Sequence, residues 1–289
     1  MATHYRGRFA PSPTGPLHFG SLVTAVASYL EARSQEGQWL IRIEDLDPLR
    51  EPPEATGQIL RSLEQHGLIP DAEIRFQSAR HEAYQAAIDT LTSRGKAYRC
   101  TCSRKQLLNN GGRHPNHCRD KDFTKTDTPF AVRFALEDET SRWTDLLLGP
   151  QTQEVQSELD DPVILRKEGF YAYQLAVVVD DIDQGITDVV RGSDLLDMTA
   201  QQQQIYRALG AEPPHWLHIP VILNEDGQKL SKQTHAPALV DANAPENLFE
   251  ALKALGQNPP ADLALKSVER ILDWGSTNWC RSAIHLTLR

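Results

Sequence analysis

The fold of this chain can be inferred from one stretch near its start, Arg8-Phe9-Ala10-Pro11-Ser12-Pro13-Thr14-Gly15-Pro16-Leu17-His18-Phe19-Gly20-Ser21-Leu22. This stretch joins a strand-like run, Tyr5 to Ala10, to a segment whose apolar residues recur at helical spacing. Gly15 and Gly20 allow close approach of the backbone, and the free N–H groups of a first helical turn attract anions. The stretch therefore predicts a strand, a turn and a helix start that can bind a phosphate group.

Polar side chains at this helix start, and others in a distant segment, can also contact phosphate. His18 and Ser21 can donate hydrogen bonds to phosphate oxygens, although on its own the stretch is equally typical of an ordinary strand-to-helix loop. Far along the chain, Lys229-Leu230-Ser231-Lys232-Gln233 follows a strand-like run, Ile219 to Leu223, and a turn at 224–227. Two lysines that flank a serine in a loop strengthen the prediction of a phosphate-binding site.

These two segments resemble the signature motifs of a known family. His18-Phe19-Gly20-Ser21 and Lys229-Leu230-Ser231-Lys232-Gln233 are similar to the two signature motifs of class I aminoacyl-tRNA synthetases. Arg8 to Gly15 and Ile41-Arg42-Ile43-Glu44-Asp45-Leu46-Asp47 resemble the glutamyl branch, in particular its truncated paralogues. The resemblance runs from Tyr5 to about Leu239. It implies an α/β fold, the class I synthetase Rossmann-type nucleotide-binding fold, with a zinc-containing α+β insertion and a short helical C-terminal appendage.

The pattern of predicted elements agrees with an α/β fold. Strands such as Trp39 to Ile43 alternate with helices such as His81 to Ser93, which predicts a parallel sheet. The continuous apolar run Leu175 to Val179 is predicted to be a buried parallel strand, followed by another over Gly185 to Arg191. Four parts are expected: the first half of the catalytic domain over 1–95, an insertion similar to the acceptor-binding insertion of the synthetases over 96–167, the second half with the KLSKQ loop over 168–240, and a helical appendage over 241–289.

An amino-acid pocket is implied by the same resemblance. Glu44 follows a predicted strand, a position suited to ligand contact in α/β sheets, although an acidic surface turn is the more common meaning of such a residue. A dianionic amino acid needs cations for its carboxylates and an acid for its ammonium group, which Arg8, Arg191 and Glu44 would provide. The resemblance implies a glutamate-binding set of Arg8, Phe9, Ala10, Pro11, Ser12, Glu44, Tyr173 and Arg191.

The resemblance also implies which residues act on ATP, which is expected with Mg²⁺. Ser21 stands where the signature more usually has a second histidine. The implied catalytic residues are His18, Ser21 and Lys232, and the implied ATP-binding residues are Gly20, Lys229, Ser231 and Lys232.

A third motif is typical of a metal site. Cys100, Cys102 and Cys118 lie in a short window with His114 and His117, and three cysteines with a histidine predict a tetrahedral structural zinc in a reducing compartment. Scattered reduced cysteines are the alternative, because Cys-x-Cys is weaker evidence than paired Cys-x-x-Cys. The related family has a tyrosine at the position of His114, which makes His114 the expected fourth ligand, with His117 as an alternative.

The bulk composition limits the partners and the location of the protein. The 289 residues carry 30 Lys plus Arg against 39 Asp plus Glu, a net charge of −9, which argues against non-specific nucleic-acid binding. A tRNA would need a local basic face, for which candidates lie between Arg99 and Lys125. No apolar run approaches the length of a membrane span and the first residues lack a signal-peptide core, so a cytoplasmic protein is expected, as a monomer.

The resemblance suggests a specific reaction. It implies ATP-dependent activation of L-glutamate as glutamyl-adenylate, followed by transfer to the queuosine base in the anticodon loop of tRNA(Asp), because the tail is too short for the anticodon-binding region of full glutamyl-tRNA synthetases. Ordinary glutamylation of tRNA(Glu) is the first alternative. A small-molecule nucleotidyltransferase on a similar fold and a non-catalytic tRNA-binding paralogue are the others.

Overall fold

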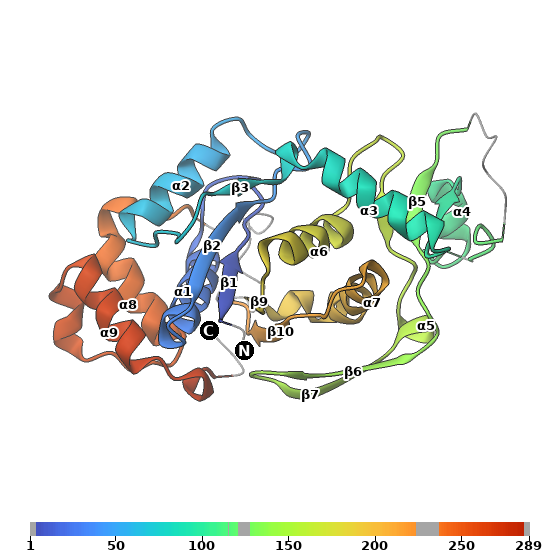
Figure 1. The fold of residues 1–289 in the computed structure, drawn as a ribbon. Helices are drawn as coiled ribbons and strands as arrows, with labels where there is room; N and C mark the ends of the chain where they lie inside the picture. The colour runs from blue at the N-terminus through green and yellow to red at the C-terminus, as the bar shows by residue number, and fades with distance from the viewer. Residues whose placement is uncertain (1–3, 115, 121–127, 224–236, 286–289) are drawn as a thin grey trace.

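Parallel strands form the centre of the protein in the computed structural model, which describes residues 4–114, 116–120, 128–223 and 237–285 (Figure 1). Strands β1 (Arg6–Phe9), β2 (Gln38–Ile43) and β3 (Arg75–Phe76) pair in parallel in that order, as do β9 (Asp188–Gly192) and β10 (His215–Ile219). The Thr187 N–H donates to the Arg6 carbonyl at 3.0 Å, which joins β9 to β1. The strand order is therefore β3-β2-β1-β9-β10, and the carboxyl ends share one edge.

Helices cover both faces of this sheet. On one face lie α1 (Phe19–Ser34), α2 (Ala55–Gln65), α8 (Ala244–Ala254) and α9 (Val268–Asn278). On the other lie α3 (His81–Ser93), α6 (Tyr173–Gln184) and α7 (Thr199–Leu209). Successive strand residues serve opposite faces, as the pleat requires: Val189 packs in the core with α6, and Val190 packs in the core with α1. The predicted α/β fold is confirmed.

The prediction of a strand over Leu175 to Val179 is wrong, because these residues lie inside helix α6. The helix is buried on most sides between the sheet and helices α3 and α7, so its sequence is apolar without interruption. A short apolar run cannot by itself distinguish a buried strand from a buried helix. The helix ends at Gly185, which has the left-handed conformation (φ 63°) typical of a helix C-terminus.

Two other elements differ in their bounds from the predictions. The strand expected over Ile219 to Leu223 is β10, which lies earlier and ends at Ile219. The strand expected over Gly185 to Arg191 is β9, which begins at Asp188 and ends at Gly192. A 3₁₀ helix, η2 (Ser193–Met198), follows it and precedes α7. Predicted residues Lys229, Ser231 and Lys232 lie outside the described residues. The other 3₁₀ helices are η1 (Gln77–Ala79), η4 (Asp241–Asn243), η5 (Ala261–Leu265) and η6 (Arg281–Ala283).

Antiparallel strands interrupt the parallel pattern within residues 96–167, the segment predicted to be an insertion. Strands β4 (Ala97–Cys100), β5 (Ala131–Phe134) and β8 (Val163–Leu165) form one small sheet, flanked by α4 (Arg104–Asn109). A long hairpin, β6 (Thr140–Asp145) and β7 (Gly149–Glu154), leads through α5 (Val155–Glu158) back to this sheet. The turn of the hairpin contacts the central sheet, since the Leu146 N–H donates to the Trp216 carbonyl at 2.8 Å. The insertion thus contributes to the edge of the catalytic core (Figure 1).

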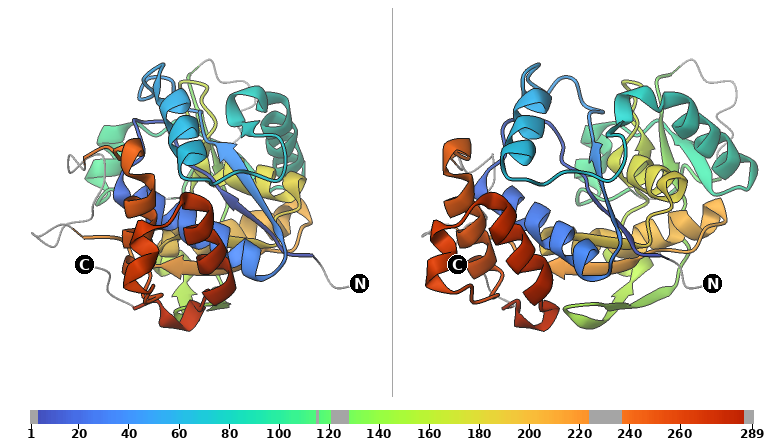
Figure 2. Two further views of the ribbon diagram at one scale, coloured as in Figure 1. Left: turned by 90° about the vertical axis from the view of Figure 1, so that its left-hand side faces the viewer. Right: turned by 60° about the vertical axis from the view of Figure 1, so that its left-hand side comes forward.

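The C-terminal helices pack directly on α1 (Figure 2). Leu252 and Ile271 belong to the same apolar core as Leu30 of α1. Buried Glu31 accepts a hydrogen bond from Trp279 Nε1 at 2.6 Å and pairs with Arg281. Among the described residues, none of the helices combines the length and the apolar character needed to span a bilayer.

Candidate active site

A pocket of about 120 Å³ lies at the carboxyl ends of β1, β2 and β9. Such a position is typical of ligand sites in parallel α/β sheets. Most of the residues predicted to bind glutamate line it, namely Arg8, Phe9, Ala10, Glu44, Tyr173 and Arg191. Ser12 instead lines an adjoining pocket of about 390 Å³, which shares Glu44 and Tyr173 with the first. Pro11 contributes through its backbone, because its carbonyl accepts the Glu44 N–H at 3.0 Å.

Arg191, at the end of β9, is a buried cation with no carboxylate partner among the described residues. Its guanidinium donates to His218, Gln202, Thr199 and the Leu195 carbonyl, all of them uncharged acceptors. Within the described part of the chain, no carboxylate lies at ion-pair distance from it. Burial lowers the pKa of Arg191 below its usual value, although an arginine remains protonated. An anion in the pocket would therefore supply the missing negative charge.

The acidic side of the pocket is held by a buried ionic network. Arg42 Nη1 lies 2.7 Å from Asp181 Oδ1, Arg8 Nε lies 3.1 Å from the same oxygen, and Arg42 Nη2 lies 3.3 Å from Glu44 Oε1. Burial raises the pKa of Glu44, although Arg42 and Arg8 oppose the shift. An ammonium group bound in the pocket would favour the ionised form of Glu44. Burial also raises the pKa of Tyr173, which keeps its hydroxyl neutral.

Sequence reasoning did not identify Arg42 and Asp181 as parts of the site. Arg42 lies on β2 inside the Ile41 to Asp47 motif, two residues before Glu44. This spacing is the feature of the sequence that could have indicated an interaction between the two side chains. In the strand predicted over Leu175 to Val179, Asp181 would lie beyond the strand end and outside the site. In the helix that actually forms, Asp181 instead faces β1 and β2.

The start of α1 has the arrangement that the opening motif predicts. His18 is the N-cap residue: its Nδ1 accepts the Ser21 N–H at 3.2 Å, and its Nε2 lies 3.0 Å from Ser21 Oγ. Gly20 lies in the first helical turn. His18 also forms a β-bridge with Ala238, so the chain that returns after residues 224–236 passes beside this helix start.

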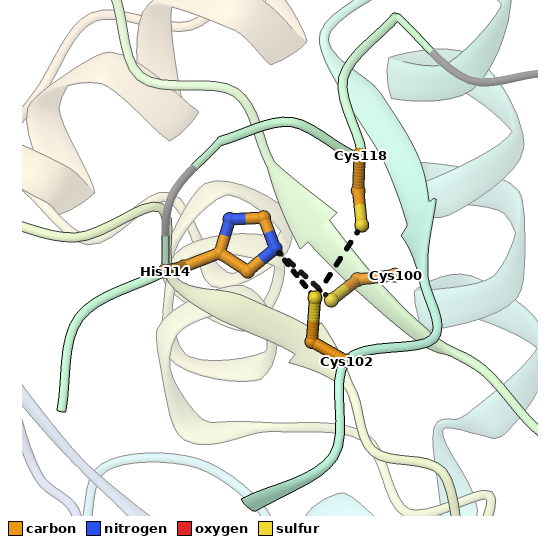
Figure 3. Close-up of side chains that lie close together, drawn as sticks. All are labelled: Cys100, Cys102, His114 and Cys118. Atoms are coloured by element: carbon orange, nitrogen blue, oxygen red, sulfur yellow. Dashed lines mark hydrogen bonds between the residues drawn. The ribbon is translucent and has the colours of Figure 1, made fainter. Parts of the chain in front are cut away.

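The four predicted metal ligands form a compact, buried cluster (Figure 3). Their ligand atoms all lie within 4.8 Å of one another. His114 Nε2 is 3.2 Å from Cys100 Sγ and 3.6 Å from Cys102 Sγ, and the sulfur atoms of Cys102 and Cys118 are 3.6 Å apart. In a tetrahedral zinc site with bonds of about 2.0 to 2.3 Å, ligand atoms lie about 3.5 to 3.8 Å apart. The cluster therefore fits zinc.

The surroundings of the cluster also fit a metal. Burial, together with the neighbouring thiols, raises the pKa of Cys102 to about 12, so the thiolates that zinc requires would need the charge of the metal. Burial lowers the pKa of His114, which favours the neutral imidazole. Its Nδ1 lies 3.2 Å from Asn116 Oδ1 and 3.1 Å from the Asn116 backbone N–H, and these contacts hold the ring with Nε2 toward the cysteines. His117 Nε2 is 3.6 Å from Cys102 Sγ but lies outside the four-residue cluster.

Comparisons with known proteins agree with this fold and site. The family model described as tRNA synthetases class I (E and Q), catalytic domain, matches residues 4–271. The glutamate-tRNA synthetase of Elizabethkingia anophelis superimposes with a TM-score of 0.82 at 25% identity, covering 99% of this chain and 68% of that chain. A glutamate tRNA ligase from Elizabethkingia meningosepticum, solved in complex with its amino acid, gives the same TM-score and covers 66% of that chain. The fold and the site thus define a class I tRNA synthetase, an ATP-dependent ligase.

Curated relatives narrow the assignment. The Glutamyl-Q tRNA(Asp) synthetase of Pseudomonas fluorescens is 48% identical over 287 residues, covering 99% of this chain and 96% of that protein. The protein of the same name from Photobacterium profundum is 46% identical, covering 96% of this chain and 89% of that protein. The chain belongs to the glutamyl-Q tRNA(Asp) synthetase family within class I.

Proposed function

We propose that this protein activates L-glutamate with ATP as glutamyl-adenylate and transfers the glutamate to the queuosine base in the anticodon loop of tRNA(Asp). The observation that carries the glutamate assignment is Arg191, a buried cation without an acidic partner among the described residues, on the wall of a pocket sized for a small ligand. The names of the relatives support the acceptor. Ordinary glutamylation of tRNA(Glu) is not favoured, since these relatives are named Glutamyl-Q tRNA(Asp) synthetase.

The pocket offers complementary charges to glutamate. Arg191 and Arg8 would bind its carboxylates, and Glu44 would bind its ammonium group. Tyr173, neutral and partly buried, would donate or accept a hydrogen bond beside Glu44. The remaining members of the set, Phe9, Ala10, Pro11 and Ser12, would shape the wall and supply backbone groups.

Activation would occur between this pocket and the start of α1. The glutamate α-carboxylate would attack the α-phosphorus of ATP, and pyrophosphate would leave. His18, Ser21 and the N–H groups of the first turn would stabilise charge on the phosphate oxygens, with Lys232 as the third catalytic residue. Gly20, Lys229 and Ser231 would contact the nucleotide, and Mg²⁺ would accompany it and neutralise phosphate charge.

Transfer requires space for an acceptor next to the activated carboxylate. The adjoining pocket of about 390 Å³, which shares Glu44 and Tyr173 with the glutamate pocket, is the space we assign to the acceptor base. A hydroxyl of the queuosine diol would attack the adenylate carbonyl, forming an ester and releasing AMP and a proton. These substrates meet in the cytoplasm, which we propose as the location, and nothing in the reaction requires more than one copy of the chain.

We also propose that zinc is bound by Cys100, Cys102, His114 and Cys118. A closed set of four protein ligands supplies no open position for chemistry, so the role of the metal would be structural. It would cross-link β4, which ends at Cys100, to the segment that carries His114 and Cys118.

The proposed function can be tested by locating the transferred glutamate. Purified protein is incubated with ATP, labelled glutamate and tRNA(Asp), and the product is digested to nucleosides. We expect the label on the queuosine nucleoside. Label on the 3′-terminal adenosine would instead indicate ordinary aminoacylation, and the absence of glutamate-dependent ATP–pyrophosphate exchange would indicate a nucleotidyltransferase of another kind or a non-catalytic binder.

A further inference from the structure

Within the part of the chain that the structure describes, the hydrogen-bond partners of the Arg191 guanidinium are all uncharged. Nε donates to His218 Nε2 at 2.9 Å, Nη1 to Gln202 Oε1 at 2.7 Å, and Nη2 to Thr199 Oγ1 at 2.9 Å and to the Leu195 carbonyl at 3.2 Å. The direction in which the guanidinium faces the pocket therefore depends on these acceptors, since no ion pair within the described residues fixes it.

The contact with His218 determines the tautomer of that histidine. An arginine Nε always donates, so His218 Nε2 must be the acceptor and carry no proton. The proton of the neutral ring then lies on Nδ1, which is 2.6 Å from Asp145 Oδ2 and donates to it. The His218 side chain is fully buried, and burial lowers its pKa, which agrees with a neutral ring.

Asp145 is in turn fixed by the backbone of the insertion hairpin. It ends strand β6, and its Oδ1 accepts the N–H groups of Leu147 at 3.0 Å and Leu148 at 2.9 Å. Burial alone would raise the pKa of Asp145, but the bonds from His218 and from these N–H groups hold it below its usual value. Asp145 therefore stays ionised and accepts only.

We propose that Asp145 and His218 are positioning residues for substrate binding: Asp145 fixes the Nδ1–H tautomer of His218, whose bare Nε2 then aligns Arg191 with a carboxylate of the substrate. This inference rests on the proposed function, in which Arg191 binds glutamate. It assigns a role in the amino-acid pocket to a residue of the insertion, because Asp145 comes from β6, whereas Arg191 comes from β9. Neither positioning residue lines the pocket itself.

The variant Asp145→Asn tests this chain of contacts with little change of shape. The asparagine oxygen would keep the N–H groups of Leu147, Leu148 and, at 3.3 Å, His218, which turns the NH₂ group toward His218 Nδ1. That group donates, so Nδ1 becomes the acceptor and the ring proton moves to Nε2, facing the donor Nε of Arg191. We expect the KM for glutamate in ATP–pyrophosphate exchange to rise at least tenfold, with the KM for ATP within twofold of the unchanged protein.

A buried aspartate that takes no part in the contacts from Asp145 to Arg191 serves as the matched control. Asp161 is buried in the same insertion and accepts hydrogen bonds from Tyr98 and the Leu136 N–H, but it does not contact Arg191 or His218. Asp161→Asn is expected to lower thermal stability and to leave the KM for glutamate within twofold. ¹⁵N NMR of histidine-labelled protein reports the tautomer directly, with the His218 signals assigned from His218→Gln.

Two substitutions of His218 complete the test. His218→Gln retains an oxygen that can accept from Arg191, whereas His218→Phe does not, so we expect the KM for glutamate to rise less in the first variant than in the second. A wild-type KM in Asp145→Asn, or an Nε2–H tautomer in the unchanged protein, would overturn the inference while leaving the proposed function intact. Absence of glutamate-dependent exchange by the unchanged protein would overturn the proposed function and this inference with it.

Discussion

Arg191 is the residue on which glutamate binding depends most directly. Replacement by glutamine removes the positive charge while keeping a polar side chain of similar reach, and a hydrogen bond to a charged group contributes about 1.5 to 3 kcal/mol. We expect Arg191→Gln to raise the KM for glutamate at least about tenfold in ATP–pyrophosphate exchange. Arg133→Gln, at another buried arginine that bonds to Asp161 in the insertion, should leave this KM unchanged. An equal rise in both variants would contradict a role for Arg191 in binding.

Substitution of a single residue, Cys102, tests the metal site. Cys102→Ser removes a ligand from the centre of the cluster, and we expect the purified protein to lose zinc, measured by elemental analysis, and to melt at least about 5 °C lower. Cys280→Ser, at an exposed cysteine, should retain about one equivalent of zinc and an unchanged Tm. Less than about half an equivalent of metal in the unchanged protein would contradict the zinc proposal.

The sequence predicted the residues that line the site better than the buried partners that hold those residues in place. Arg8, Glu44 and Tyr173 follow from a family motif, and the structure brings them together on one pocket wall with Arg191. Their buried partners come from elements far away in the chain, such as Asp145, which lies 73 positions before His218. No local pattern marks such a pair, because only the packing of β6 beside β10 brings it together.

At the scale of the element, the strands and most helices could be predicted because their periodicity reflects partial burial. Helix α6 could not, because it is covered by the sheet on one side and by α3 and α7 on others, so the polar face that would reveal a helical period is missing. The acidic residues that end its apolar run, Asp180 and Asp181, are buried partners of arginines and tyrosines and do not face solvent.

The C-terminal helices offer a test at this scale. Gly256 ends the turn after α8 with a left-handed backbone (φ +70°), and a Cβ there would lie 2.1 Å from the Ala283 carbonyl oxygen. Gly256→Ala should therefore cost the usual penalty for such a conformation, about 1 to 2 kcal/mol, and a further loss from displacement of the last turn. Gly95 has a similar φ of +66°, and a Cβ there would meet open space. Gly95→Ala should therefore lose only the stability that the left-handed backbone conformation costs an alanine. Equal losses of Tm would contradict this packing of the last turn.

At the scale of the whole molecule, the ionic network around Asp181 joins β1, β2 and α6 and makes stability depend on pH. Burial would raise the pKa of Asp181, but Arg42 and Arg8 hold it below its usual value. A carboxylate with a lowered pKa in the folded state contributes stability above the pKa of the unfolded chain, about 3.9, and loses it as pH falls through the folded value. We expect the free energy of unfolding to fall steeply below about pH 4.

Asp181→Asn should change this pH dependence in a specific way. At pH 7 the variant should be about 3 to 5 kcal/mol less stable, because Arg42 and Arg8 lose a buried partner. Below about pH 4 its stability should fall less steeply than that of the unchanged protein, measured by urea unfolding across pH. Asp183→Asn, at a half-exposed aspartate, is the control. Parallel curves for Asp181→Asn and the unchanged protein would contradict the account.

The most direct test of the proposed function compares two tRNA pools, one from cells that make queuosine and one from cells that do not. Purified protein, ATP and labelled glutamate are added to each, and label retained on tRNA is counted. We predict label in the first pool only. Equal labelling of both pools would contradict transfer to queuosine and would indicate an ordinary tRNA(Glu) synthetase.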